Sequence, residues 1–191
     1  MRLFIAADLG DAARAAVAAE QERIRDALGR APSLKWVKPE HAHLTLVFLG
    51  NVDDARVSAI VAAVGADIES QKPFDIVLEG AGVFPARGAP RVLWIGIIRG
   101  AADVIALQRT LASRVAAIGV ALEEREFHPH LTLARWRESH PADRQRALRA
   151  GRHGTIAETR IDGATLYQSR LSPTGPAYTP LARANLTGAS T

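Results

Sequence analysis

The tetrapeptide His-Leu-Thr-Leu occurs twice in this chain of 191 residues, at residues 43–46 and again 87 positions later at residues 130–133. The hydropathy pattern around the two copies repeats as well. In each half an apolar strand precedes an amphipathic helix, two further strands, a second helix and another strand. We interpret this order as the internal duplication of one unit, with the tetrapeptide on the third strand of each copy.

The local patterns predict the individual elements. Short apolar or alternating runs predict strands at residues 2–9, 33–37, 43–50, 73–80, 91–98, 120–127, 130–135, 155–162 and 164–171. Apolar residues at helical spacing predict helices at residues 10–28, 57–68, 104–118 and 141–150. Residues 80–90 concentrate Gly and Pro and are expected to form a loop.

Neighbouring strands along the chain favour antiparallel pairing, so we expect an α+β protein and not a doubly wound parallel sheet. Residues 1–191 are predicted to form one domain of two duplicated, pseudo-symmetric lobes with a joint near residues 80–90. Each lobe is expected to contain an antiparallel sheet and helices. If an approximate twofold axis relates the lobes, the two tetrapeptides face each other across a central cleft.

The composition limits the chemistry that the chain can perform. It contains no cysteine, which excludes disulfides, thiolate catalysis and cysteine-ligated metals. No apolar run is long enough to span a membrane, and residues 1–10 are too short for a signal peptide, so we expect a soluble cytoplasmic protein. The formal net charge of +4 is modest but favours a phosphate-bearing partner such as RNA. No obligate protein partner is evident.

The two tetrapeptides present the same pair of polar side chains. Because side chains alternate on a strand, His43 and Thr45 point to one face, and His130 and Thr132 do likewise. Two imidazoles facing one cleft suit phosphodiester cleavage, in which one group removes a proton while another donates one on the opposite side of phosphorus. The hydroxyls and Arg135 are candidates for holding the non-bridging phosphate oxygens. This chemistry requires no metal or other cofactor.

Two other functions stay open at this point. His41 and His128 each lie two residues before a motif histidine, so each strand end offers a His-x-His pair of the kind that binds metals. A His-ligated metalloprotein is therefore an alternative, although it leaves Thr45 and Thr132 without a role. The other alternative is a module that binds RNA ends or nucleotides without turnover.

Aromatic residues supply candidates for stacking on a base. They are Trp36, Phe84, Trp94, Trp136 and Tyr178. We expect Trp94 to pack in the core because it lies within a continuous apolar strand. Phe84 and Trp136 are better placed to line the cleft.

The two H-x-T-x motifs resemble those of the 2H phosphoesterases, and in particular the RNA 2′,3′-cyclic phosphodiesterases, also called 2′-5′ RNA ligases. The similarity extends over almost the whole chain. It includes the stretches MRLFIAADL, WVKPEHAHLTLVFLG, GVFPARGAPRVLWIGI, FHPHLTLAR and LYQSRLSPTGPAYTPL, in this order.

The resemblance implies a bilobed, LigT-like α+β fold and a metal-independent phosphoric diester hydrolase of the EC 3.1.4 class. Its substrates would be RNA 3′ ends that bear a 2′,3′-cyclic phosphate, or cyclic nucleotides, and its product a 2′-phosphate. By match to the family motif, His43 would be the proton donor and His130 the proton acceptor. Thr45 and Thr132 would orient the phosphate. The family also includes members credited with 2′-5′ RNA ligation, the reverse chemistry.

Overall fold

A computed structural model describes residues 1–29, 33–122, 126–172 and 175–188 of the chain. The strands are β1 (Arg2–Asp8), β2 (Leu34–Trp36), β3 (His43–Asn51), β4 (Phe74–Phe84), β5 (Val92–Arg99), β6 (His130–Trp136), β7 (Thr155–Ile161), β8 (Gly163–Ser172) and β9 (Gly175–Asn185). The helices are α1 (Asp11–Leu28), α2 (Val57–Gly65), α3 (Ala101–Ala117) and α4 (Pro141–Ala150). Two short 3-10 helices, Pro39–His41 and Asp54–Arg56, precede β3 and α2.

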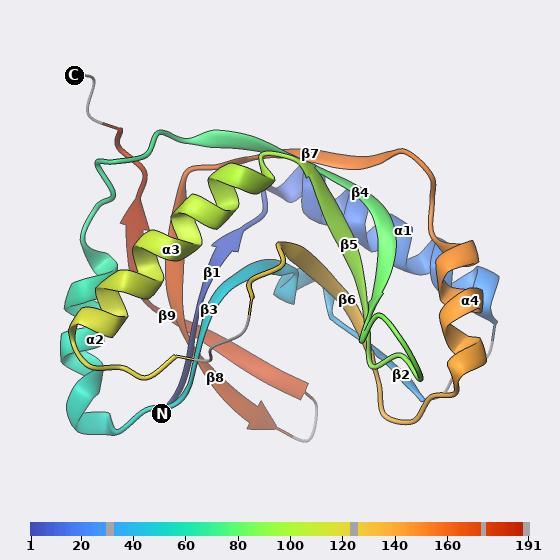
Figure 1. The fold of residues 1–191 in the computed structure, drawn as a ribbon, viewed down its shortest axis with the longest axis horizontal. Helices are drawn as coiled ribbons and strands as arrows, with labels where there is room; N and C mark the ends of the chain where they lie inside the picture. Colours follow the sequence, from blue (N-terminus) through green and yellow to red (C-terminus); the bar gives the residue numbers. More distant parts are fainter. Residues whose placement is uncertain (30–32, 123–125, 173–174, 189–191) are drawn as a thin grey trace.

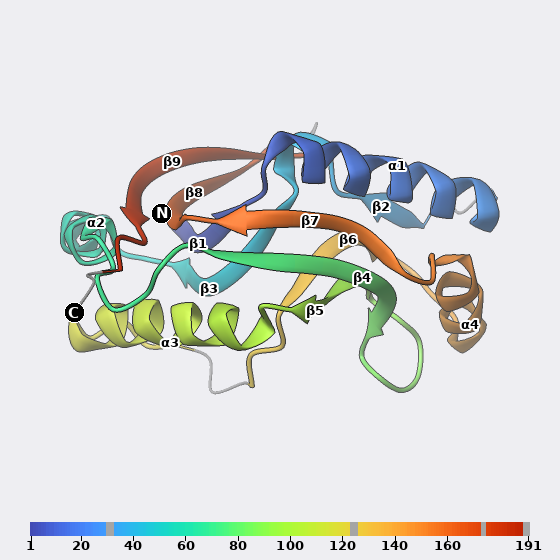
Figure 2. The ribbon, with the colours of Figure 1, turned by 90° about the horizontal axis from the view of Figure 1, so that it is seen from above.

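The strands form two antiparallel sheets; one occupies the left and the other the right of Figure 1, and Figure 2 shows the curvature of their strands. Sheet A has the order β3-β1-β8-β9, and sheet B has the order β2-β6-β5-β4-β7. All pairings within the sheets are antiparallel, both between strands that follow one another in the chain, such as β8 and β9, and between distant strands, such as β1 and β8. The predicted α+β class with antiparallel sheets is confirmed.

Each sheet combines strands from both halves of the chain. β2 and β4 belong to the first half but lie in sheet B, whereas β8 and β9 from the second half lie in sheet A. The segment at residues 80–90 therefore does not separate the two sheets, because it joins β4 to β5 within sheet B. The orders β3-β1-β8-β9 and β6-β5-β4-β7 match position by position, which is the pattern that a duplication with exchanged strands would produce. The duplication itself stays a prediction.

Helices pack against the outer face of each sheet. α1 contacts β7, and α4 contacts α1 and β4, so both cover sheet B, while α2 packs on β8 and β9 and α3 on β3. The predicted apolar stripes make these contacts. The residues of the α1 and α3 stripes that are buried are Ala13, Val17, Ile24, Leu28, Val104, Leu107, Leu111 and Val115. One face of each sheet is thereby left for the site.

Two predictions differ from the structure, and one strand was not predicted. The strand predicted at residues 120–127 is not formed at 120–122 or 126–127, and residues 123–125 lie outside the described part. Residues 80–84 extend β4, because this Gly-containing segment pairs with β5. β9 was not predicted; it contains Pro176 and Pro180, which are accommodated because β9 is the outermost strand of sheet A, where a missing N–H is tolerated.

None of the helices in the described ranges is long and apolar enough to cross a bilayer.

Candidate active site

The alternation predicted for the two tetrapeptides is confirmed. On β3, Leu44 is buried under sheet A, while His43 and Thr45 are partly exposed on its inner face. On β6, Leu131 is buried in the same way, and His130 and Thr132 are partly exposed. Each sheet therefore presents one imidazole and one hydroxyl on the face that its helices do not cover.

A backbone carbonyl two residues earlier holds each histidine ring. His130 Nδ1 lies 2.7 Å from the carbonyl oxygen of His128, and because a carbonyl can only accept, Nδ1 is the donor. The carbonyl of His41 makes the corresponding hydrogen bond to His43. His43 Nε2 is 3.1 Å from Thr45 Oγ1. Because Nδ1 of His130 donates to the carbonyl, Nε2 is the nitrogen of this ring that would transfer a proton.

An aromatic group surrounds His43. Its ring stacks on Phe4 with a centroid separation of 4.9 Å, and Tyr178 meets it edge-on at 5.4 Å. Tyr167 lies close to both rings, with its centroid 5.4 Å from that of Phe4 and 6.5 Å from that of His43. Burial among these rings lowers the pKa of His43 to about 4, against the raising effects of the His41 carbonyl and the Asp8 charge. His43 is therefore neutral at pH 7 in the substrate-free protein.

A second aromatic group surrounds His130. Phe84 meets the ring edge-on at 5.0 Å, and Trp94 lies at 6.2 Å. The indole of Trp94 crosses β4 at Gly82, where any Cβ would overlap it. The expectation for Phe84 is confirmed, whereas Trp94 lines the site and does not belong to the core. Alternation along β5 explains this difference: Leu93 and Ile95 are buried in the core, so Trp94 between them points to the opposite face, where it pairs with Thr132.

Arg135 connects the two sheets electrostatically. It lies on β6, and its positive charge acts on two residues of sheet A. Burial lowers the pKa of His43, and the charge lowers it further; burial raises the pKa of Tyr178, and the charge opposes this rise. Its side chain is exposed. The inner faces of the two sheets therefore lie close enough for a guanidinium from one to act on an imidazole of the other.

Asp8 is a neighbour of His43 that sequence reasoning did not identify. It is the cross-strand partner of His43, and its carboxylate accepts hydrogen bonds from Tyr167 Oη at 2.7 Å and Thr165 Oγ1 at 2.9 Å. Arg183 Nη1 is 3.6 Å from the same carboxylate. These contacts join β1 to β8 and β9, which are distant in the sequence, so only the assembled sheet could reveal them.

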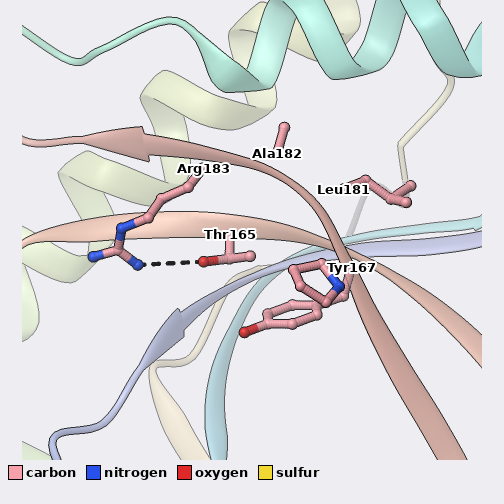
Figure 3. Close-up of a pocket in the computed structure, with 6 residues that line it drawn as sticks. Thr165, Tyr167, Leu181, Ala182 and Arg183 are labelled. Atoms are coloured by element: carbon pink, nitrogen blue, oxygen red, sulfur yellow. Dashed lines mark hydrogen bonds between the residues drawn. The ribbon is translucent and has the colours of Figure 1, made fainter.

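A pocket of about 360 Å³ lies beside this group. Its lining is formed by residues of β8 and β9: Thr165, Tyr167, Pro180, Leu181, Ala182 and Arg183. Figure 3 shows the hydrogen bond between Arg183 and Thr165 at one side and the Tyr167 ring at the other. None of the four motif residues lines it, so the pocket adjoins the histidine site without containing it.

The remaining sequence-predicted residues lie elsewhere. Trp36 packs against the core and lies under the guanidinium of Arg25 on α1, and Trp136 also packs against the core. The expectation that Trp136 lines the cleft is therefore wrong, since the register of β6 turns it to the helix-covered face. His41 packs on Tyr178 and His128 near Phe84.

The residues that the metalloprotein alternative requires do not converge. In the described ranges, no group of three or more His, Asp and Glu side chains is placed as metal ligands would be.

Comparison with known proteins gives the same result as the motifs. The model of the 2′-5′ RNA ligase superfamily matches residues 13–172. A protein named RNA 2′,3′-cyclic phosphodiesterase from Methanothermobacter thermautotrophicus is 33% identical over 183 residues, covering 95% of this chain and 96% of that protein. A protein of the same name from Thermus thermophilus is 33% identical over 193 residues, covering 98% and 91%.

Two solved structures share the fold over nearly all of their length. The crystal structure of TT0787 of Thermus thermophilus has a TM-score of 0.78 at 31% identity and covers 98% of this chain and 99% of that chain. E. coli LigT complexed with 3′-AMP has a TM-score of 0.75 at 28% identity, with coverage of 97% and 98%. The resemblance seen in the two H-x-T-x motifs is confirmed: this chain belongs to the 2′-5′ RNA ligase superfamily.

Proposed function

We propose that this protein hydrolyses the 2′,3′-cyclic phosphate at RNA 3′ ends to a 2′-phosphate, with His43 and His130 as the two proton-transfer groups. One observation carries the proposal: each sheet presents a His and a Thr on its inner face, and a backbone carbonyl holds each imidazole. The names of the relatives supply the substrate class. E. coli LigT has been crystallised with 3′-AMP, a nucleotide with a phosphate on the ribose, which agrees with this class.

The reaction needs one proton acceptor and one proton donor. A water molecule attacks phosphorus, and His130 Nε2 removes its proton as the new P–O bond forms. The P–O3′ bond breaks on the opposite side, and His43 Nε2 protonates the departing 3′ oxygen. The phosphate stays on the 2′ oxygen. The assignment of the donor to His43 and the acceptor to His130 follows the family motif.

Thr45, Thr132 and Arg135 are proposed to bind the non-bridging oxygens. Hydroxyl and guanidinium donors stabilise the negative charge that these oxygens carry in the transition state. Thr45 donates to the phosphate in place of its present contact with His43. The aromatic groups around the two histidines, with Tyr178 and Phe84 at the edges of the rings, offer surfaces for the terminal base.

The protonation state of His43 depends on the substrate. Burial makes the ring neutral at pH 7 when the site is free. A bound cyclic phosphate is an anion next to the ring, and an adjacent anion favours the protonated imidazole. Binding therefore raises the pKa of His43 toward the range in which it can donate a proton.

The test is turnover of 2′,3′-cyclic AMP. His43→Ala and His130→Ala should each lower kcat by at least about a hundredfold, with wild-type circular dichroism. The control His153→Ala removes an exposed histidine outside the site and should retain wild-type turnover. Full activity of either motif variant would contradict the proposal, as would a cyclic end that wild-type protein binds and leaves unchanged, the result expected of a binding module.

A modified substrate tests which histidine is the acid. A sulfur in place of the 3′ oxygen leaves as a thiolate without needing a proton, so a variant that lacks only the acid should recover on it. We expect His43→Ala to regain most of the lost rate and His130→Ala to regain none. Recovery of His130→Ala instead would reverse the two roles.

The description of the matched family favours a second activity, 2′-5′ RNA ligation. In this reaction the 5′ hydroxyl of a second RNA replaces water as the nucleophile, and His130 removes its proton. The 3′ oxygen departs with the proton from His43, and a 2′-5′ phosphodiester results. Incubating an RNA with a cyclic end and one with a 5′ hydroxyl tests this activity, because only ligation yields a longer product.

A further inference from the structure

The sixth residue of each motif copy differs: counting from the histidine, the first copy has Phe48 where the second has Arg135. By alternation alone, the sixth residue would point away from the histidine's face. A β-bulge at the fourth residue of each copy turns Phe48 and Arg135 back to the inner face. On β3, Ala6 pairs with Thr45 and Ile5 with Val47, which leaves Leu46 as the extra residue. The same bulge on β6 leaves Leu133 as the extra residue. Phe48 and Arg135 therefore occupy equivalent places in the two sheets.

In sheet A, the guanidinium of Arg2 lies over the ring of Phe48. Its Cζ lies 5.1 Å from the centroid of the Phe48 ring, in a cation–π arrangement. Arg2 and Phe4 are two residues apart on β1, so their side chains lie on the same face, and Phe4 is the cross-strand partner of Phe48. Arg135 in sheet B and Arg2 in sheet A, the latter over the Phe48 ring, thus place a guanidinium at equivalent positions of the two inner faces.

Arg2 lies beyond the ring that stacks on His43. Phe4 makes that stack, and the next inner-face position along β1 is about 7 Å further away. The charges of Arg2 and Arg135 both oppose the rise in the pKa of Tyr178 that burial causes, so both guanidinium groups lie within electrostatic reach of this tyrosine. Arg2 is therefore outside the reacting centre but adjacent to its aromatic edge.

This part of the surface is open and unneutralised. Phe48 is 41% exposed, unusually high for a phenylalanine, and Arg2 is exposed. Within the described ranges no carboxylate forms an ion pair with Arg2, in contrast to Arg183 on the same sheet, which contacts two aspartates. An exposed guanidinium held over an aromatic ring and free of a carboxylate suits an RNA phosphate, with the ring edge available to a sugar or base.

We propose that Arg2 and Phe48 form a second subsite, which binds a backbone phosphodiester of the RNA on the 5′ side of the cyclic end. This inference rests on the proposed function and adds a preference for longer chains. A mononucleotide has a phosphate at the histidines only, whereas an oligonucleotide also supplies a phosphate to Arg2. The subsite would make the enzyme favour RNA ends over free cyclic nucleotides.

The test compares Arg2→Gln and Phe48→Leu with the control Arg109→Gln, which removes an exposed arginine on α3. The substrates are 2′,3′-cyclic AMP and a six-nucleotide RNA with a cyclic end. We expect Arg2→Gln to lower the ratio of oligonucleotide to mononucleotide kcat/KM by about tenfold, an ordinary loss for one charged phosphate contact. Phe48→Leu should lower it less, and Arg109→Gln should leave it unchanged.

Salt dependence provides a second measurement. Removing one phosphate contact to single-stranded RNA should make the slope of log kcat/KM against log salt for the oligonucleotide shallower by about 0.7. An unchanged ratio and slope would overturn the inference. An equal loss on both substrates would also overturn it, because Arg2 would then act on the reacting centre or the fold.

The outcome remains informative if the proposed function fails. Should wild-type protein hydrolyse neither substrate, the same variants are compared by fluorescence anisotropy with a six-nucleotide RNA that ends in a 3′-phosphate. Weaker binding by Arg2→Gln than by Arg109→Gln supports the subsite, and equal binding overturns it.

Discussion

Asp8 and His43 are cross-strand partners on β1 and β3, and the Asp8 carboxylate is held 2.7 Å from the hydroxyl of Tyr167. Asp8 thereby places a fixed negative charge beside the histidine that we propose as the proton donor. This charge raises the pKa of His43, although burial lowers it more. Asp8 is a positioning residue, since it acts on the reaction through His43.

Asp8→Asn should shift the pH profile of kcat. The amide oxygen still accepts hydrogen bonds from Tyr167, but the charge that favours protonated His43 is gone, so the limb due to this proton donor moves to lower pH. At pH 7.5 we expect kcat to fall by about three- to tenfold, which corresponds to a pKa shift of up to about one unit. Steady-state kinetics between pH 5 and about pH 9 measures the limb.

Asp162→Asn is the matched control for Asp8→Asn. Asp162 also forms an ion pair with Arg183 but is exposed and belongs to the turn before β8. Its removal should leave the profile of wild type unchanged. A lower kcat for Asp8→Asn with an unmoved limb would show that Asp8 has only a structural role.

The unfolding free energy should fall as the pH is lowered because of His43. The folded pKa is about 4 and the unfolded value about 6.5. Above pH 6.5 neither state binds the proton, and the stability is fully present; between pH 6.5 and about 4 only the unfolded state binds it, so stability is lost. Allowing for the partial exposure of the ring, we expect a loss of about 1–2 kcal/mol. Urea unfolding at pH 7.5 and pH 4.5 measures it, and His43→Asn should lose less over this interval than wild type. An identical loss in the variant would assign the effect to other groups.

Gly82→Ala should disturb the wall beside His130. Any Cβ at this position overlaps the Trp94 indole, so the ring must move away from its place near the imidazole. We expect kcat/KM to fall by at least about tenfold, because small displacements near a reacting group are costly. Gly65→Ala, whose Cβ would meet only Ala182 at 3.4 Å, is the control and should retain activity.

A double variant separates this effect from general misfolding. Trp94→Phe removes much of the ring that the new methyl group overlaps, so Gly82→Ala should cost less activity in that background than in wild type. Additive losses would mean that the glycine matters for a reason other than the indole.

Glu20→Gln should destabilise the junction between α1, α4 and the loop before β7. The Glu20 side chain is only 2% exposed and accepts hydrogen bonds from Arg23 Nε at 2.8 Å and from the Arg152 N–H at 2.9 Å. Burial opposes its ionisation, but these donors outweigh burial and keep the pKa of Glu20 below its usual value. We expect a loss of about 1–3 kcal/mol in unfolding free energy.

Glu22→Gln provides the comparison on the same helix. Glu22 pairs with Arg25 at the same i,i+3 spacing but is 61% exposed, so its loss should change stability by less than about 0.5 kcal/mol. Thermal unfolding of both variants at pH 7 measures the difference. Equal effects would show that burial does not distinguish the two pairs.

Most helices and strands could be predicted from the sequence, because the pattern of apolar residues that specifies each one lies within the element itself. The period of the α1 and α3 stripes predicted both helices, and the alternation in His-Leu-Thr-Leu predicted which residues face the site. β9 is not predictable in this way, because Pro176 and Pro180 are typical strand breakers in a local pattern. Both prolines are tolerated because β9 is the outermost strand of sheet A, a position that only the tertiary structure assigns.

The sequence by itself determined the residues that we propose for the chemistry, namely two His-x-Thr pairs, together with their alternation and the family to which the chain belongs. Tertiary structure decided what surrounds each pair. The exchange of strands between sheets placed Tyr167 and Tyr178 of the second half beside His43 of the first. The bulges turned Phe48 and Arg135 to the inner faces. Such contacts depend on register and on pairing between distant segments, which no local pattern of residues encodes.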